Sequence, residues 1–101
     1  MRIIATARLD KTRPVLVLTR PSASQRFTWV SVAPITSTIR GLSPEVPLGP
    51  RNGLDHACVV NCDAIQTIPL ADLGDTIGLL FDDQEPALTK AIHDAYDLTD
   101  E

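Results

Sequence analysis

Two stretches decide the fold of this chain: Lys11-Thr12-Arg13-Pro14-Val15-Leu16-Val17-Leu18 and Val30-Ser31-Val32-Ala33-Pro34-Ile35-Thr36-Ser37. Both are apolar and contain β-branched residues, a pattern typical of buried β-strands. Arg13 opens the first apolar run and Thr36 closes the second. If the two strands pair as neighbours in a small barrel, these side chains meet at one rim. A guanidinium beside a hydroxyl is suited to phosphate, because both groups donate hydrogen bonds to phosphoryl oxygens.

The rest of the chain predicts a mostly β protein with one helix at its C-terminal end. Asn52-Gly53 is a strong turn signal, and Gly78 inside an apolar run indicates a bulge or close packing. After a cap at Asp82 or Asp83, apolar residues recur at helical spacing over residues 87–96. We expect one domain over residues 1–101, a small SH3-like antiparallel barrel or sheet with a C-terminal helix. Its strands are predicted at residues 3–9, 15–19, 27–35, 45–48, 57–61, 64–68 and 76–81.

Charge is distributed unevenly along the sequence. The net charge is -4, but residues 1–51 carry eight Lys and Arg against two acids, and residues 52–101 carry one Lys against eleven acids. Seven of the eight basic residues in the first part are Arg, which favours planar contacts to phosphates and bases. This split supports a basic, nucleic-acid-binding face on an otherwise acidic protein. The alternative is a solvated surface on which the gradient has no function.

Several classes of protein are disfavoured by what the sequence lacks. It has no run of eighteen apolar residues, so we expect no membrane segment. The apolar stretch at the N-terminus is short and is soon followed by the charged residues Arg8 and Asp10, which is not typical of a signal peptide, so we expect a cytoplasmic protein. Cys58 and Cys62 are expected to be reduced and to pack as small apolar residues. No further Cys or His cluster completes a zinc set, so neither a metal nor another cofactor is expected.

The order of the motifs resembles the MazF/PemK family of toxin endoribonucleases, and within it a mycobacterial subgroup with a short N-terminus. The resemblance runs from Lys11 over about 85 residues. After the two opening stretches come Glu45-Val46-Pro47-Leu48, Gly53-Leu54-Asp55, Asn61-Cys62-Asp63-Ala64-Ile65-Gln66-Thr67-Ile68, Ile77-Gly78-Leu79-Leu80 and the terminal helix. Each motif alone is weak, but their ordered series is specific.

The resemblance implies the MazF/CcdB type of barrel and a homodimeric, metal-independent, sequence-specific ribonuclease for single-stranded RNA. It also implies a cognate MazE-like antitoxin that neutralises the enzyme. Arg13 and Thr36 match the family's catalytic Arg and Thr. Two departures are visible: the loop before the Thr-Arg-Pro motif is short, so no acid aligns with the base that some members use there, and Gln66 stands where many members have Arg or Lys. The candidates for RNA binding are Arg8, Lys11, Arg20, Arg26, Ser37, Arg40 and Gln66.

The chemistry needs few groups because the 2'-hydroxyl of RNA is itself the nucleophile. The protein must remove its proton, stabilise the anionic phosphorus centre and protonate the leaving 5'-oxygen. Arg13 suits the second task, and Thr36 and Ser37 can donate further hydrogen bonds. His56 and His93 are the side-chain types best suited to proton transfer, and Asp10 is a further candidate base because it neighbours Arg13. His93 is expected on the polar, solvated side of the terminal helix, whereas His56 follows the Asn-Gly turn and could approach the site or lie solvated in its loop.

Each candidate also has a plain structural interpretation. Arg13 could form a surface ion pair with Asp10 or Asp63, and Thr36 could cap a turn at the end of its strand. Trp29 could stack on a base, but in an apolar strand it is more often part of the core.

Two other functions stay open at the level of the sequence. A CcdB-like toxin that binds gyrase would share the fold, but its C-terminal Trp-Gly-Ile is absent from the terminal Asp97-Leu98-Thr99-Asp100-Glu101. A noncatalytic RNA-binding barrel would share the charge split.

Overall fold

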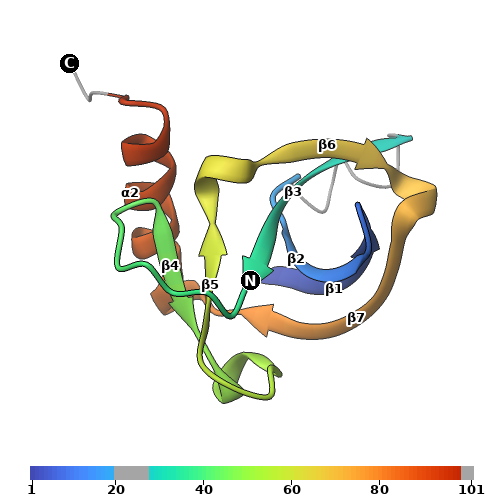
Figure 1. The fold of residues 1–101 in the computed structure, drawn as a ribbon, viewed down its shortest axis with the longest axis horizontal. Coiled ribbons are helices and arrows are strands. Elements are labelled where there is room, and N and C mark those ends of the chain that lie inside the picture. Colours follow the sequence, from blue (N-terminus) through green and yellow to red (C-terminus); the bar gives the residue numbers. More distant parts are fainter. Residues whose placement is uncertain (20–27, 99–101) are drawn as a thin grey trace.

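The computed structural model describes residues 1–19 and 28–98 of the chain. The fold is mostly β with a helix at the C-terminal end, as the sequence predicts (Figure 1). Its strands are β1 (Arg2–Arg8), β2 (Thr12–Val17), β3 (Trp29–Thr36), β4 (Glu45–Leu48), β5 (Cys58–Asn61), β6 (Gln66–Pro69) and β7 (Leu73–Leu80). The described helices are the 3-10 turns η1 (Pro50–Asn52), η2 (Cys62–Ala64), η3 (Leu70–Asp72) and η4 (Asp82–Gln84), followed by α2 (Glu85–Ala95).

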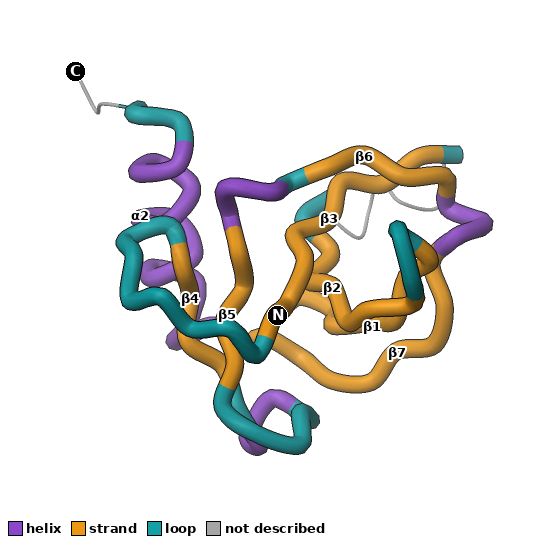
Figure 2. The backbone as a smooth tube through the Cα atoms, viewed as in Figure 1, coloured by secondary structure: helices purple, strands orange, loops and turns teal. Residues whose placement is uncertain are grey.

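The sheet is antiparallel in every described pairing and strongly curved. Its order is β4-β5-β3-β2-β1-β7, with β6 as a further partner of β3. The beginning of β3 pairs with β6 and its end pairs with β5, because the chain turns at η2 between these two strands. Figure 2 shows the result, in which β6 and β7 arch around β1 and β2 while β4 and β5 stand to one side.

The register between β2 and β3 fixes the relative positions of the two predicted catalytic residues. Val15 pairs with Pro34, Leu16 with Ala33 and Val17 with Val32. Extending this antiparallel register by two residues places Arg13 opposite Thr36. The prediction that the two strands are neighbours is therefore confirmed.

The terminal helix covers the core beside β4 and β5 (Figure 1). Leu88 and Ala91 are buried in one apolar cluster with residues of β1 to β5 and β7, including Ile4, Leu16 and Val60. Pro86 lies in the first turn of α2, where its missing N–H has no intrahelical partner to lose. None of the described helices is long and apolar enough to cross a membrane.

Several boundaries differ from the sequence-based expectation. β2 begins at Thr12 rather than at residue 15, because Thr12 and Arg13 pair with Arg8 and Ala7 of β1. β7 begins at Leu73 rather than at residue 76 for the same reason, since Leu73 pairs with Ala7. The predicted strand at residues 64–68 is displaced to Gln66–Pro69, because η2 occupies residues 62–64.

The predicted cap of the terminal helix was wrong. Asp82 and Asp83 lie within the short helix η4, and Gln84 is the residue that precedes α2. The Gln84 side chain accepts a hydrogen bond from the Phe81 amide at 2.9 Å. This bond closes the turn of η4, and the Gln84 side chain makes no cap hydrogen bond to α2 itself.

The structure also tests where Trp29 and the two cysteines lie relative to the core. Trp29 is 55% exposed at the start of β3, so the core position expected for it was wrong. It lies at the opposite end of β3 from Thr36, so it is also no part of the rim that Thr36 occupies. Cys58 and Cys62 are buried free thiols, as predicted, and burial raises the pKa of Cys62 to about 11.

Candidate active site

Arg13 and Thr36 line two neighbouring hollows at the rim of the barrel. The hollows have volumes of about 390 and 480 Å³, and Arg13, Ile35 and Thr36 contribute to both. Arg13 comes from β2 and Thr36 from the end of β3, and both side chains are half-buried. The structure thus brings together the two residues that the sequence singled out.

Arg13 forms a two-pronged ion pair with Asp10, which precedes it in the tight β1–β2 connection. Its Nε donates to Asp10 Oδ1 at 2.9 Å and its Nη2 to Asp10 Oδ2 at 3.1 Å. The hydrogen bond from Arg13 lowers the pKa of Asp10 from 3.8 to about 2, with help from the Lys11 backbone amide. The bond to Asp10 in turn raises the pKa of Arg13. The expected ion pair with Asp10 is confirmed, whereas Asp63 only lines the same hollow.

Thr36 caps the turn that follows β3. Its Oγ1 accepts a hydrogen bond from the Thr38 amide at 3.1 Å, which confirms the structural role expected of it. That bond uses a lone pair of the hydroxyl oxygen, so the hydroxyl hydrogen is free to be donated to a ligand. Capping and ligand binding are therefore compatible at this residue.

The smaller hollow combines basic and acidic side chains. Arg40 and Gln66 line it together with Arg13, which brings two of the predicted RNA-binding residues to the pair. Three carboxylates line it as well, those of Asp10, Glu45 and Asp63. Glu45 was not among the sequence-based candidates, because an isolated acid in a sequence carries no signal of what it faces, and Asp63 was considered only as an ion-pair partner of Arg13. Its remaining walls are Leu9, Pro34, Thr38, Leu42 and Asn61.

The larger hollow extends from the same pair toward the loop that follows η1. Lys11 and Ser37, both predicted to bind RNA, line it, and so does His56. His56, which the sequence left as either solvated or close to Arg13 and Thr36, thus lines the same hollow as that pair. Its other walls are Thr12, Pro14, Gly53, Leu54, Asp55, Cys58 and Ile77.

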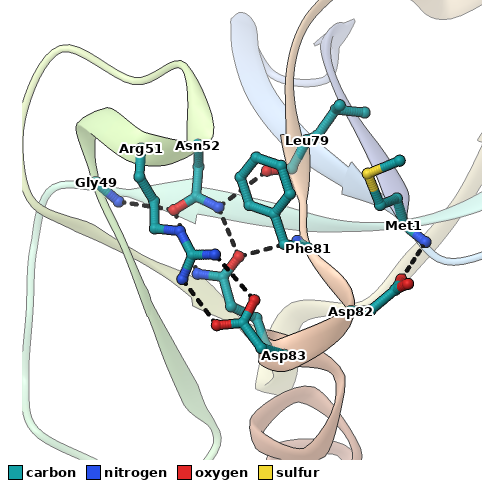
Figure 3. A network of polar contacts seen from close by, with 9 residues as sticks. Met1, Gly49, Arg51, Asn52, Leu79, Phe81, Asp82 and Asp83 are labelled. Carbon is teal, nitrogen blue, oxygen red and sulfur yellow. Dashed lines mark hydrogen bonds and ion pairs between the residues drawn. The ribbon is translucent and has the colours of Figure 1, made fainter.

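A buried polar network centred on Asn52 holds that loop in place (Figure 3). The Asn52 side chain is 1% exposed; its amide donates to the Leu79 carbonyl at 2.9 Å and to Gln84 Oε1 at 2.8 Å. Its oxygen accepts from the Gly49 amide at 3.2 Å. A Cβ on Gly78 would collide with the Asn52 carbonyl oxygen, so the glycine is needed for this close approach. The close packing predicted at Gly78 is confirmed.

Two arginines of the basic first half are used in structural ion pairs. Arg51 forms a two-pronged pair with Asp83 at 2.9 and 3.0 Å and stacks over the Phe81 ring at 4.8 Å (Figure 3). Arg2 pairs with Glu85 at 2.7 Å and donates to the Leu18 carbonyl. The acidic second half of the sequence therefore neutralises part of the first half in space.

The remaining predicted residues lie elsewhere. Arg8 lines neither of the two hollows but a smaller one beside Asp72 and Leu73. Arg20 and Arg26 lie outside the described residues. Among residues 1–19 and 28–98, no group of three or more His, Cys, Asp and Glu side chains is arranged to hold a metal ion.

Comparison with known proteins gives a consistent result. The chain is 56% identical over 98 residues to Endoribonuclease MazF3 of Mycobacterium tuberculosis. The alignment covers 97% of this chain and 95% of the relative. The solved structure of the Mycobacterium tuberculosis toxin MazF-mt6 superimposes with a TM-score of 0.95 at 55% identity, covering 97% of this chain and 99% of that one.

A more distant structure, an endoribonuclease in complex with its cognate antitoxin from a mycobacterial species, shares the fold. Its TM-score is 0.84 at 23% identity, and the match covers 96% of this chain and 93% of that one. Residues 4–96 match the family described as PemK-like, MazF-like toxins of type II toxin-antitoxin systems. On the family match and the near-full-length identity, this chain belongs to that toxin family.

Proposed function

We propose that this protein is a toxin endoribonuclease that cleaves single-stranded RNA by attack of the RNA 2'-hydroxyl, without a metal, and so blocks translation and growth. The observation that carries the proposal is the Arg13–Thr36 pair, which adjacent strands hold between two hollows. The similarity to Endoribonuclease MazF3 over nearly the whole chain supports the same activity.

Arg13 is the group that stabilises the transition state. Its planar guanidinium already makes a two-pronged contact with the two oxygens of a carboxylate, and two non-bridging phosphoryl oxygens present a similar target. Thr36 lies across the strand pair and donates its hydroxyl hydrogen to the same phosphate. Negative charge grows on these oxygens during attack, so both donors bind the transition state more strongly than the ground state.

Asp10 is the carboxylate placed to take the 2'-hydroxyl proton. With a pKa of about 2 it is a weak base while it is paired with Arg13. A phosphate that binds the Arg13 fork competes with Asp10 for the same donors, and loss of those hydrogen bonds raises the carboxylate pKa. Substrate binding thereby makes Asp10 a better base at the moment when one is needed. His56, in the adjoining hollow, is the candidate acid for the leaving 5'-oxygen.

The proposed assembly is a homodimer neutralised by a MazE-like antitoxin. The fold is shared with an endoribonuclease solved in complex with its cognate antitoxin, which supports an antitoxin partner for this chain too. Within the described residues, Lys11, Arg13 and Arg40 give the rim the cations that an acidic antitoxin segment would contact.

One incubation tests the proposal: purified protein with a long RNA in EDTA. We expect cleavage that leaves 2',3'-cyclic phosphate (or its 3'-phosphate hydrolysis product) and 5'-hydroxyl ends. Arg13→Ala and Thr36→Ala should each lower the rate about a hundredfold or more, the scale for a positioned transition-state donor. Arg13→Lys should recover only part of it, because an ammonium cannot form the fork.

The matched controls lie outside both hollows. Arg51→Ala removes another exposed Arg–Asp fork, and Thr89→Ala removes an exposed hydroxyl of α2, and both should cut RNA at close to the wild-type rate. Activity abolished by EDTA and restored by magnesium would refute the mechanism. Full activity of both Arg13→Ala and Thr36→Ala would place the site elsewhere.

A further inference from the structure

The loop between β3 and β4 is folded around the carboxylate of Glu45. Glu45 Oε1 accepts from the Arg40 amide at 3.2 Å, from the Gly41 amide at 2.9 Å and from the Leu42 amide at 3.2 Å. Glu45 Oε2 accepts from the Arg40 amide as well, at 3.3 Å. Three successive backbone amides thus converge on one carboxylate, an arrangement that proteins otherwise use to bind external anions.

The backbone of Glu45 is fixed by strand pairing, and the β3–β4 loop adopts a conformation that directs its amides toward the Glu45 carboxylate. Glu45 is the first residue of β4 and pairs with Asn61 of β5, so its backbone belongs to the sheet. Gly41 has φ +72°, a left-handed conformation that turns consecutive amides toward one point. A Cβ on Gly41 would meet nothing within 4 Å, so the glycine is required by its backbone angle and not by lack of space.

This loop carries side chains to the proposed catalytic pair. Thr38, Arg40 and Leu42 line the smaller hollow beside Arg13 and Thr36. Within the described residues the Arg40 guanidinium has no ion-pair partner, whereas the amide of the same residue is bound twice by Glu45. The backbone at Arg40 is therefore fixed while its charged group stays available.

We propose that Glu45 is a positioning residue: its carboxylate fixes the loop so that Arg40 can bind an RNA phosphate next to the one held by Arg13. The inference rests on the proposed ribonuclease function and adds a second phosphate contact and the residue that organises it. Glu45 itself does not touch the reacting atoms.

The proposal predicts an effect opposite in sign to simple electrostatics. A carboxylate in a phosphate-binding hollow repels RNA, so its removal alone should tighten binding. If Glu45 instead organises the loop, Glu45→Gln should weaken binding, because the amide has one acceptor oxygen and its NH2 group faces backbone donors. Asp63→Asn is the matched control, since Asp63 lines the same hollow but is not the acceptor for these amides.

The experiment measures affinity for an RNA that carries a 2'-deoxy group at the mapped cleavage position and so cannot be cut. Glu45→Gln and Arg40→Ala should each weaken binding about tenfold, the effect of one lost phosphate contact. Each should also reduce the salt slope by about 0.7. The double variant should bind no more weakly than Arg40→Ala alone, because Glu45 acts through Arg40. Asp63→Asn should bind as tightly as the wild type or more tightly.

Kinetics and a second perturbation separate positioning from general damage. Glu45→Gln should raise KM with little change in kcat, whereas a merely unstable enzyme would lose active fraction and hence kcat. Glu45→Asp, which keeps the charge, should restore part of the affinity. Gly41→Ala strains the same loop from its other side and should reproduce the KM effect if Glu45→Gln fails to fold.

The outcomes distinguish the two proposals. Wild-type binding, or tighter binding, by Glu45→Gln in a protein that does cleave RNA would overturn the role of Glu45 alone. Additive losses in the double variant would overturn it as well. Absence of cleavage by the wild type would instead overturn the proposed function.

Discussion

Asn52→Ala is the substitution whose effect follows most directly from the structure. Asn52 is 1% exposed, and the change removes its bonds to the Leu79 carbonyl, Gln84 Oε1 and the Gly49 amide. At about 1 kcal/mol for each bond, and with buried partners left unpaired, the free energy of unfolding should fall by about 3 kcal/mol. That is a large share of the roughly 5–15 kcal/mol typical of a folded domain.

The assay is urea unfolding at a fixed protein concentration, since dissociation of the proposed dimer would otherwise add its own contribution. Asn61→Ala is the matched control, because Asn61 is only half-buried and accepts one bond, from the Asp63 amide. It should cost less than about 1 kcal/mol. Asn52→Asp should be at least as harmful as the alanine change, because it places an oxygen opposite the Leu79 carbonyl.

The same substitution should also affect the proposed site. Asn52 holds the segment that carries Gly53, Leu54 and His56 into the larger hollow, so Asn52→Ala should lower kcat/KM for RNA as well. A loss of less than about 1 kcal/mol in the free energy of unfolding would refute the reasoning, because it would mean that the network contributes little.

Three further outcomes are expected. The logarithm of the affinity for the uncut 2'-deoxy RNA should fall linearly with the logarithm of the salt concentration. The slope should be about -2 for three contacts, from Lys11, Arg13 and Arg40, and nearer -3.5 if five cations contribute. A slope near zero would mean that these cations do not bind the RNA backbone. Light scattering at micromolar concentration should give a mass near twice that of one chain, and a monomer mass would refute the dimer. The difference in the free energy of unfolding between the wild type and Asp10→Asn should be present above pH 3.8 and vanish as the pH falls through about 2, because the pKa of Asp10 is lowered in the folded state. Urea unfolding of both proteins across this pH range measures that difference.

The fold was predictable where a local pattern decides it. The apolar runs around Leu16 and Val32 gave the right strands, because alternation and β-branching are set by the residues themselves. Strand ends were less predictable, since Thr12 and Leu73 join strands only through pairing with β1. Trp29 was misplaced for a similar reason: which face of a strand is buried depends on neighbours that the sequence does not name.

The site was predictable only in its central pair. Arg13 and Thr36 lie near the ends of two apolar runs, so they were expected to meet if the two strands were neighbours, and the family resemblance pointed to the same pair; the register of β2 and β3 confirms that the strands are neighbours. The role of Glu45 was not predictable, because three amides converge on it only once the loop has closed around Gly41. The uneven distribution of charge along the sequence only partly predicted the basic residues near the site, since Arg51 and Arg2 form ion pairs with Asp83 and Glu85 of the acidic second half.

The smaller hollow holds two carboxylates, those of Asp10 and Glu45, that accept hydrogen bonds from donors of the protein itself, and their surroundings give them different roles. Asp10 is exposed and binds the fork of Arg13 and the backbone amide of Lys11 in the short β1–β2 connection, so in the proposed mechanism a substrate phosphate can replace it at Arg13 without disturbing the sheet. Glu45 belongs to β4 and binds backbone amides, so its displacement would unfold the loop that carries Arg40. The first contact should therefore exchange during binding, while the second persists through the catalytic cycle. In the proposed mechanism the substrate phosphate therefore displaces Asp10, which binds a side chain, and leaves Glu45, which binds backbone amides, in place.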